Sequence, residues 1–331
     1  MRIAVDAMGG DFAPRAAVEG ALAAARDLRA ALVLAGREDA VRAELARHET
    51  GGLDIEVRHA DDVIAMGEAP MAALRAKPRS SIRVAAEAVT RGEANAVFSA
   101  GHTGAAVLAT HAAFGMLPGV DRPALAVIIP TKSGRAVLLD AGATVDCRPH
   151  HLFQFAAMGT VVARVALDVA SPRVGLLSIG EEESKGNDLT REAHRLLRGS
   201  PVNFVGNLDA GGVYSGHADV IVCDGFTGNV ALKVSESLAS AIAGLLDEEL
   251  SRTVTARAGF LLARRAFERL HRRLDYAEYG GAPLVGVHGL CVIGHGRSDA
   301  RAIRNGIALA LRLAAMGFVE RIAEDIQVAH S

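Results

Sequence analysis

The chain has 331 residues, of which 50% are hydrophobic, enough to bury the core of a large soluble enzyme. Its 36 basic and 38 acidic residues leave a formal net charge of −2, which gives no reason to expect a nucleic acid as partner. The three cysteines are far apart and form no Cys-x-x-Cys pair, a pattern that argues against disulfides and a zinc site and fits a reducing cytoplasm.

The first half of the chain repeats one design, in which an apolar strand ends in small and polar residues and a helix follows. The N-terminal apolar run is too short for a signal peptide, so we interpret it as the first strand. The uncharged residues 95–120 contain histidine, glycine and proline, which favours a strand, a loop and a helix over a membrane span. We expect residues 66–79, with their two prolines, to be irregular. The predicted strands are residues 3–5, 32–36, 55–57 and 96–98, and the predicted helices are residues 15–28, 37–48 and 82–90, with another opening at residues 99–106.

The second half begins with two apolar segments, residues 125–130 and 135–140, that flank Thr-Lys-Ser-Gly and suit an antiparallel hairpin. Further strands are predicted at residues 174–179, 220–223 and 290–294, and further helices at residues 151–167, from 189 onward and up to 316. The pattern predicts an α/β fold with a doubly wound, mixed but mostly parallel sheet. We expect residues 1–331 to form a single catalytic domain, with two lobes sharing a sheet as the alternative.

Residues 235–250 and 251–274 have the pattern of two long amphipathic helices joined near Thr253, which predicts a projecting hairpin over residues 235–274. The second helix has seven arginines and one acid. Its apolar stripe consists of Phe260, Ala263, Phe267, Leu270 and Leu274. We expect this stripe to pair hairpins across a two-fold axis into a homodimer.

Phe260, Leu261 and Leu262 are consecutive, so one helical face cannot bury all three. Beside arginines they suit contact with an anionic membrane surface. Closing the end of a dimer bundle is an equally good interpretation from periodicity alone.

The strand at residues 220–223 ends at Asp224-Gly225, and Asn229 is predicted to cap a helix that starts near Val230. Backbone N–H groups that converge in such a turn form an anion site outside the carboxyl end of the strand. Related turns follow other strands, and we expect all of them along one edge of one sheet. They begin at Asp6, Gly101, Asp140, Gly180 and Gly294.

Among these turns, Lys185 lies between glycine and amide residues, and a phosphate contact and a solvated surface position are equally open. His102 and His295 could bind phosphate, transfer a proton or only bond to the backbone. Cys223 is interpreted as a buried structural thiol. The motifs Gly-x-Gly-x-x-Gly, Gly-x-Ser-x-Gly and His-Glu-x-x-His are absent, so nucleotide binding, serine hydrolysis and zinc chemistry have no support.

Seven motifs occur in order along the chain: Asp-Ala-Met-Gly-Gly-Asp at 6–11, Ser-Ala-Gly-His-Thr-Gly-Ala at 99–105, Asp-Cys-Arg-Pro at 146–149, Gly-Glu-Glu to Lys-Gly-Asn at 180–187, Asp-Gly-Phe-Thr-Gly-Asn at 224–229, Tyr-Gly-Gly-Ala-Pro at 279–283 and Gly-His-Gly-Arg-Ser at 294–298. With them the chain resembles, over nearly its whole length, the phosphate acyltransferases of bacterial phospholipid synthesis.

The resemblance implies that a long-chain acyl group passes from acyl carrier protein to inorganic phosphate, giving an acyl phosphate and free carrier without cofactor or metal. It also implies a fold similar to the isocitrate and isopropylmalate dehydrogenases. The expected protein is a cytoplasmic homodimer, peripherally associated with the inner face of the membrane, and a membrane acyltransferase that takes the acyl phosphate is a further candidate partner.

On this basis one phosphate oxygen attacks the thioester carbonyl, and preorganised donors stabilise the oxyanion that develops. The expected catalytic groups are Lys185, Asn187, Asp224, Asn229 and His295. The expected substrate-binding residues are Asp6, Gly9, Gly10, Asp11, Gly101, His102, Thr103, Gly104, Gly186, Gly225, Gly228 and Gly296. No covalent nucleophile is assigned.

The chain departs from the family pattern at a few positions. His102, His288 and Asp299 stand where asparagine is more common, and residues 210–212 lack an expected Arg-Asp pair, which bears on substrate specificity. Two alternatives are a metal- and nicotinamide-dependent decarboxylating dehydrogenase on the same fold and a membrane-surface scaffold. The absence of a paired-Asp metal motif and of a dinucleotide motif argues against the dehydrogenase.

Overall fold

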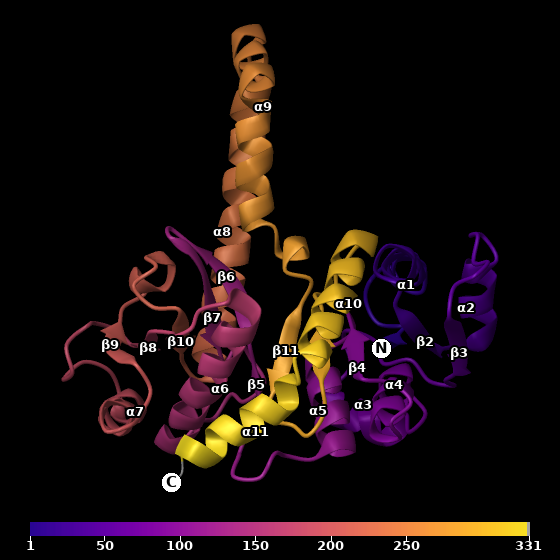
Figure 1. Cartoon of the computed structure of the whole chain (residues 1–331). Helices are drawn as coiled ribbons and strands as arrows, with labels where there is room; N and C mark the ends of the chain where they lie inside the picture. The colour runs from indigo at the N-terminus through magenta and orange to yellow at the C-terminus, as the bar shows by residue number, and fades with distance from the viewer. Residues whose placement is uncertain (330–331) are drawn as a thin grey trace.

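The strands pair in two separate sheets, and most of the pairs are parallel (Figure 1). The structure is a computed structural model that describes residues 1–329. The seven-stranded sheet has the order β3-β2-β1-β4-β12-β11-β5, and the five-stranded sheet has the order β6-β7-β10-β8-β9. Antiparallel pairs occur at β11 with its two neighbours and between β6 and β7, the predicted hairpin. The α/β class with a mixed, mostly parallel architecture is therefore confirmed.

The strands are short and mostly apolar, as expected for sheets covered on both faces. Those of the first sheet are β1 (Arg2–Asp6), β2 (Ala31–Gly36), β3 (Ile55–His59), β4 (Ala96–Ser99), β5 (Ala124–Leu125), β11 (Ala282–Val285) and β12 (Cys291–Ile293). Those of the second are β6 (Val127–Thr131), β7 (Gly134–Leu139), β8 (Val174–Leu177), β9 (Phe204–Leu208) and β10 (Val220–Val222).

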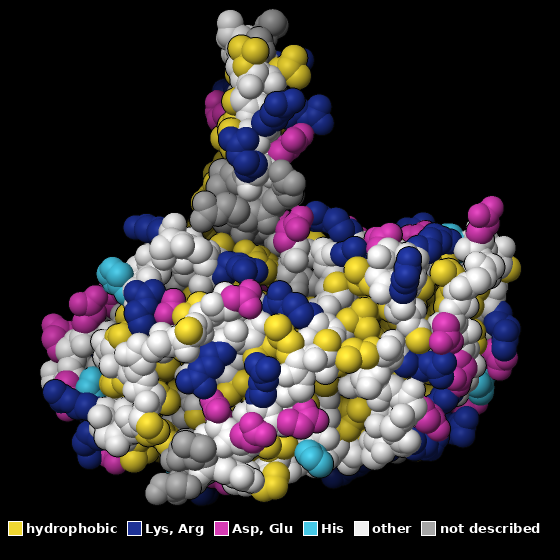
Figure 2. Space-filling view, viewed as in Figure 1, with side chains coloured by type: hydrophobic (Ala, Val, Ile, Leu, Met, Phe, Trp, Pro, Cys, Tyr) yellow, Lys and Arg dark blue, Asp and Glu magenta, His cyan; other side chains and the backbone are white. Residues whose placement is uncertain are grey.

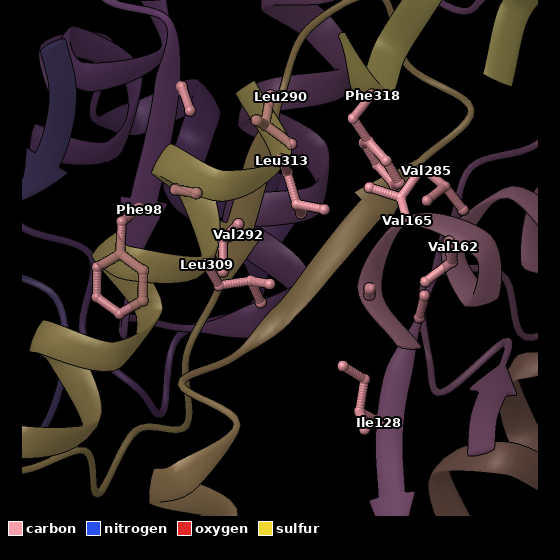
Figure 3. Packing of buried hydrophobic residues seen from close by; sticks show 14 of the residues in the cluster. Phe98, Ile128, Val162, Val165, Val285, Leu290, Val292, Leu309, Leu313 and Phe318 are labelled. Atoms are coloured by element: carbon pink, nitrogen blue, oxygen red, sulfur yellow. The ribbon is translucent and has the colours of Figure 1, made fainter. Parts of the chain in front are cut away.

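Helices cover the sheets and join them into one core. The helices beside the first sheet are α1 (Arg15–Leu28), α2 (Glu38–Leu45), α3 (Pro70–Ala76), α4 (Ser81–Thr90), α5 (Thr103–Phe114) and α10 (Ala300–Ala315), and those of the second lobe are α6 (Pro149–Leu167) and α7 (Asp188–Arg198). The last helix, α11 (Phe318–Ala329), packs against α6. Figure 3 shows Phe98 of β4 and Ile128 of β6 in the same buried cluster, so apolar packing is continuous between the lobes.

One prediction about elements is wrong, and two strands and the last helix, α11, have no counterpart among the predicted elements. Residues 66–79 contain the short helix α3, because Pro70 occupies its first turn, where no backbone N–H donor is needed. The strands β9 and β11 were not predicted, and β11 includes a proline that usually argues against a strand. Each of them depends on a neighbouring strand distant in the sequence, which local patterns do not contain.

The predicted projecting hairpin is present as α8 (Gly225–Ser251) and α9 (Val254–Leu274), which extend away from both sheets (Figure 1). The first helix starts at Gly225 and not near Val230, so Asn229 is not its cap. Leu238 and Ile242 are 58% and 55% exposed on α8. The side chains of Leu270 and Leu274 in the predicted stripe lie outside the described residues.

By length and composition, α8 is the one described helix that could cross a membrane on its own, with a mean hydropathy of 1.2 over a window that is not buried. The helices α10 and α11 pass the same test only as a pair, and they are bent by 55°.

Candidate functional site

The turns that follow β1, β4 and β12 interlock at one edge of the first sheet, because these three parallel strands are neighbours. The backbone N–H of Asp11 donates to the carbonyl of Gly296 at 2.8 Å. A Cβ atom at Gly9 would lie 2.7 Å from the backbone nitrogen of Gly101, so that approach requires glycine. The substrate-binding residues predicted in these three turns are therefore brought together.

Asp6 lies under this edge and is 5% exposed. Its Oδ2 atom accepts the hydroxyl of Ser99 at 2.7 Å, and Ser99 Oγ in turn accepts the N–H of Gly101 at 3.1 Å. Burial raises the pKa of Asp6, although hydrogen bonds from Ser81 and Ser99 act in the opposite direction. The cavity beside it measures about 10 Å³, room for one water molecule, and Asp6 positions the turns through Ser99. Its predicted role in substrate binding stays a prediction.

The next helix, α5, begins at Thr103 and is capped by His102, whose Nδ1 accepts the N–H of Gly104 at 3.1 Å. A Cβ atom at Gly104 would lie 2.9 Å from Pro70 of α3. His102 therefore acts as a capping residue, which accepts a backbone N–H at a helix start.

A second set of turns follows β7, β8 and β10 at an edge of the second sheet. Asp140 is fully buried there and accepts four backbone N–H groups, from Leu125 at 2.8 Å, Gly142 and Ala143 at 3.0 Å, and Thr144 at 2.6 Å. Burial raises the pKa of Asp140 despite these donors. Because Leu125 belongs to β5, this carboxylate also joins the two sheets.

The predicted single edge is thus wrong: Asp6, Gly101 and Gly294 belong to the first sheet, and Asp140, Gly180 and Asp224 to the second. The reason is that the chain changes sheets between Leu125, the end of β5, and Val127, the start of β6. No turn residue signals this change, so a sequence reading assigns all the strands to one sheet.

Two of the predicted catalytic residues cap helices. Asp224 accepts the N–H and the hydroxyl of Thr227 at 2.9 and 2.7 Å at the start of α8. Asn187 accepts the N–H of Thr190 at 2.9 Å at the start of α7. At the start of α8 the N–H of Gly225 is also bonded, to the carbonyl of Thr144 at 2.9 Å, so an anion there would have to use other N–H groups of the first turn.

Lys185 and Asn229 are exposed, and neither side chain makes a hydrogen bond or ion pair with a described residue. Gly186 adopts φ +102°, and a Cβ atom there would lie 2.1 Å from Thr190 Oγ1, so the turn after Lys185 requires glycine. Since β8 and β10 are parallel neighbours, Lys185 and Asn229 follow adjacent strands of one sheet. Their predicted roles in catalysis stay predictions.

The two lobes meet through three side chains at the base of the hairpin. Lys233 Nζ lies 3.0 Å from Glu236 Oε2 and 3.2 Å from Nε2 of His295, which belongs to the turn after β12. Burial alone would raise the pKa of Glu236, but hydrogen bonds from His295 and Lys233 outweigh it and lower that pKa, so Glu236 is ionised at neutral pH. Of these three residues the sequence analysis selected only His295. A signal was present, since Lys233 and Glu236 are the only charged residues between Gly225 and Leu246.

A largely apolar groove of about 920 Å³ runs between β6, α8 and α9; we call it the hairpin groove. Its lining includes Ile128, Pro130, Leu238, Ile242, Leu246 and Phe260. Glu236 also lines it, so the groove adjoins the Lys233 and His295 contact. Hydrophobic side chains are visible at the foot of the hairpin in Figure 2.

Among the described residues, one group has the composition of a metal site. The ligand atoms of Glu19, Glu44 and His48 lie within 4.8 Å of one another on α1 and at the end of α2. Glu44 is already bonded to Arg47 at 3.0 Å and to His48 at 3.3 Å. This group lies apart from both turn edges and supplies nothing to the candidate site.

Known proteins similar to this chain place it in a family. A family model described as a fatty acid synthesis protein matches residues 1–321. A phosphate acyltransferase of Geobacter sp. (strain M21) is 50% identical over 326 residues, 98% of this chain and 93% of that protein. The phosphate acyltransferase of Pelotomaculum thermopropionicum is 49% identical over 327 residues, 99% and 94% of the two chains.

Solved structures with little sequence identity share the fold alone. A phosphotransacetylase from Streptococcus pyogenes has a TM-score of 0.66 at 18% identity, covering 96% of this chain and 94% of its own. A 4-hydroxythreonine-4-phosphate dehydrogenase from Klebsiella pneumoniae has a TM-score of 0.54 at 14% identity, covering 95% and 99%. The second agrees with the expected dehydrogenase-like fold. The motifs and the fold agree with these relatives, and the match to them extends over 98% of this chain or more. The chain therefore belongs to the phosphate acyltransferase family and is an acyltransferase.

Proposed function

We propose that this acyltransferase moves a long-chain acyl group from acyl carrier protein to inorganic phosphate, and that both lobes act as one catalytic unit. The observation that carries the proposal is the contact between the lobes, in which Lys233 of α8 lies 3.2 Å from His295 in the glycine-rich turn after β12. Helix N-termini favour anions, and phosphate is the anion that the reaction consumes.

In the proposed reaction, phosphate binds to backbone N–H groups of the turns near Gly101, Gly186 and Gly225, with Lys185 and His295 adding positive charge or hydrogen-bond donors. A phosphate oxygen attacks the thioester carbonyl, a C–O bond forms, and the C–S bond breaks to release the carrier thiolate, which takes up a proton. Turn N–H groups and the amides of Asn187 and Asn229 are the candidate donors to the oxyanion. Asp224 orients the phosphate, which is already partly dianionic at neutral pH, so little base catalysis is required.

The test is to incubate the purified protein with acyl-ACP and phosphate and to measure free carrier thiol. We expect thiol release that depends on phosphate. A reaction without phosphate dependence, or none at all, would contradict the proposal. Reduction of a nicotinamide cofactor with a hydroxy acid would instead favour the dehydrogenase alternative.

We further propose that the protein works as a homodimer on the inner face of the membrane. The support is the unusual exposure of the hairpin: Leu261 and Leu262 are 70% and 90% exposed, beside arginines of α9. Phe260 instead packs against Phe267, with ring centroids 5.1 Å apart. A second hairpin along α8 would cover Val234 and Leu245, which are 61% and 64% exposed and do not line the hairpin groove. An acyl phosphate made at the membrane could pass to a membrane acyltransferase.

A further inference from the structure

The contact between Lys233 and His295 joins two hydrogen-bond donors. Nδ1 of His295 accepts the backbone N–H of Arg297 at 3.2 Å, so the ring proton lies on Nε2. Nε2 is the atom that faces Lys233 Nζ at 3.2 Å. An ammonium group has no acceptor, so with this tautomer Lys233 Nζ and His295 Nε2 face each other as two donors. A shared acceptor is needed to stabilise this approach.

Glu236 supplies that acceptor within the protein. Its Oε2 atom lies 3.0 Å from Lys233 Nζ and 3.7 Å from His295 Nε2, so one carboxylate oxygen faces both donors. The distance between Glu236 Oε2 and His295 Nε2 is long for a charge-assisted hydrogen bond. The three side chains are 54%, 29% and 30% exposed for Lys233, Glu236 and His295, so an external anion can reach them.

The hairpin groove adjoins this group of donors. Its lining follows α8 from Leu232 to Leu250, and Glu236 belongs both to the lining and to the donor contact. The groove volume of about 920 Å³ lies within the range of small-molecule sites, and most of its lining is apolar. A ligand that binds both to the Lys233 and His295 donors and in the hairpin groove has an anionic head and a long apolar tail.

We propose that Lys233 and His295 bind the phosphate group of the acyl phosphate, that the acyl chain lies in the base of the hairpin groove, and that Glu236 occupies the anion position in the free enzyme. This inference rests on the proposed function, because it names where that product is held. It assigns a substrate-binding role to Lys233, and it makes Glu236 a competitor of the ligand and not a ligand contact.

The inference is tested by the binding of alkylphosphonates with 4, 8 and 12 carbons, measured by calorimetry on the full chain. For the wild type we expect affinity to rise with chain length, by up to about fourfold for each fully buried methylene. Lys233→Met should weaken all three ligands by about tenfold or more through loss of a charged donor. Glu236→Gln should strengthen all three, because the neutral amide competes less well for the donors.

The groove has its own variant and matched control. Ala239→Phe fills the groove beside Glu236, and we expect it to remove the dependence on chain length while leaving butylphosphonate binding unchanged. Ser240→Phe is the control, since Ser240 is the next residue, is exposed and does not line the groove. Both variants are checked by sedimentation.

The inference is overturned if Glu236→Gln weakens binding, if wild-type affinity is independent of chain length, or if Ala239→Phe changes the oligomeric state, which would place a partner chain in the groove base. Wild-type turnover of acyl-ACP with phosphate is measured in parallel. Turnover without phosphonate binding would reject this inference and leave the proposed function standing. Binding without turnover would reject the proposed function and leave only a binding site for an anion with an apolar tail.

Discussion

Buried ionisable side chains in this protein are structural. Asp140 organises a loop through four backbone donors, and Asp6 organises the opposite turn edge through Ser99. Cys223 is 2% exposed, and burial raises its pKa well above the ordinary value, which agrees with the predicted structural thiol. The residues placed to act on a ligand are instead partly exposed, as at Lys233 and His295.

A first prediction concerns the thiols. Burial raises the pKa of Cys147 and of Cys291 to about 12. At pH 8 only about one thiol in ten thousand would then be ionised, and the thiolate is the reactive form. We expect the native protein to react very slowly with a thiol-specific disulfide reagent at pH 8 and to react with all three cysteines in denaturant. Rapid reaction of a thiol in the native protein would contradict the burial and the raised pKa of that thiol.

A second prediction concerns Lys185. If its ammonium contacts phosphate, Lys185→Ala should reduce kcat/KM for phosphate roughly 10- to 150-fold. This factor corresponds to about 1.5–3 kcal/mol of transition-state stabilisation, as for a lost charge-assisted hydrogen bond. The dependence on acyl-ACP concentration should change little. The exposed Lys132 in the β6–β7 turn provides a matched Lys132→Ala control. Unchanged phosphate kinetics in Lys185→Ala would remove this residue from the site.

At the scale of elements, the start of α8 packs closely against the loop that Asp140 holds. A Cβ atom at Gly228 would lie 1.9 Å from the carbonyl oxygen of Asp140 and 2.9 Å from Cys223 Sγ. Neither neighbour is the flexible end of a long side chain. The glycine in the motif at residues 224–229 therefore allows α8 to approach the loop that Asp140 holds.

The third prediction follows from this approach. Gly228→Ala should lower the free energy of unfolding by at least about 1–3 kcal/mol, because the overpacked contact forces a backbone shift. Gly244→Ala is the control on the same helix, since no atom lies within 4 Å of its added methyl group. That control should be neutral or stabilising by about 1 kcal/mol at most, because alanine favours helix. Equal urea midpoints for the two variants would contradict the steric argument.

At the scale of the whole molecule, the hairpin is the part that the rest of the chain does not cover. The most apolar window of α8 has no buried residue, although soluble proteins rarely leave large apolar patches uncovered. A partner hairpin and a membrane surface would cover different parts of it. The first would cover α8, and the second would cover Leu261 and Leu262 near the tip.

The fourth prediction is that the hairpin makes the dimer. Val234→Glu with Leu245→Glu, two exposed positions on one face of α8 outside the groove lining, should produce monomers in sedimentation velocity, because two charges would be buried without partners at the interface. Ser240→Glu, on the same helix, should remain dimeric. A dimer that survives the double substitution would show that another surface is used.

The fifth prediction is that the tip binds anionic membranes. The wild type should float with anionic liposomes at low salt and less at high salt, since arginines and exposed leucines act together. Leu261→Asp with Leu262→Asp should float less, provided that this variant is still dimeric and active on soluble acyl-ACP. Equal flotation of both proteins, or of neither, would defeat the proposal.

The sequence by itself determined the α/β class, most helices and strands, the hairpin, and the family, because these depend on local periodicity and on ordered motifs. It located the turns at Gly101, Asp224 and Gly294 for the same reason. A turn's glycine and capping residues act within a few residues of one another, so they are visible in any short stretch of chain.

Only the tertiary structure decided how those turns are grouped. The division into two sheets depends on strand pairs far apart in sequence, such as β4 with β12 and β7 with β10. The start of α8 at Gly225 depends on Asp224 as its cap, whereas the sequence also allowed Asn229. The contact of Lys233 with His295 joins residues 62 positions apart, from a helix in one lobe and a turn in the other. Local patterns cannot specify such contacts, because packing between the lobes fixes them.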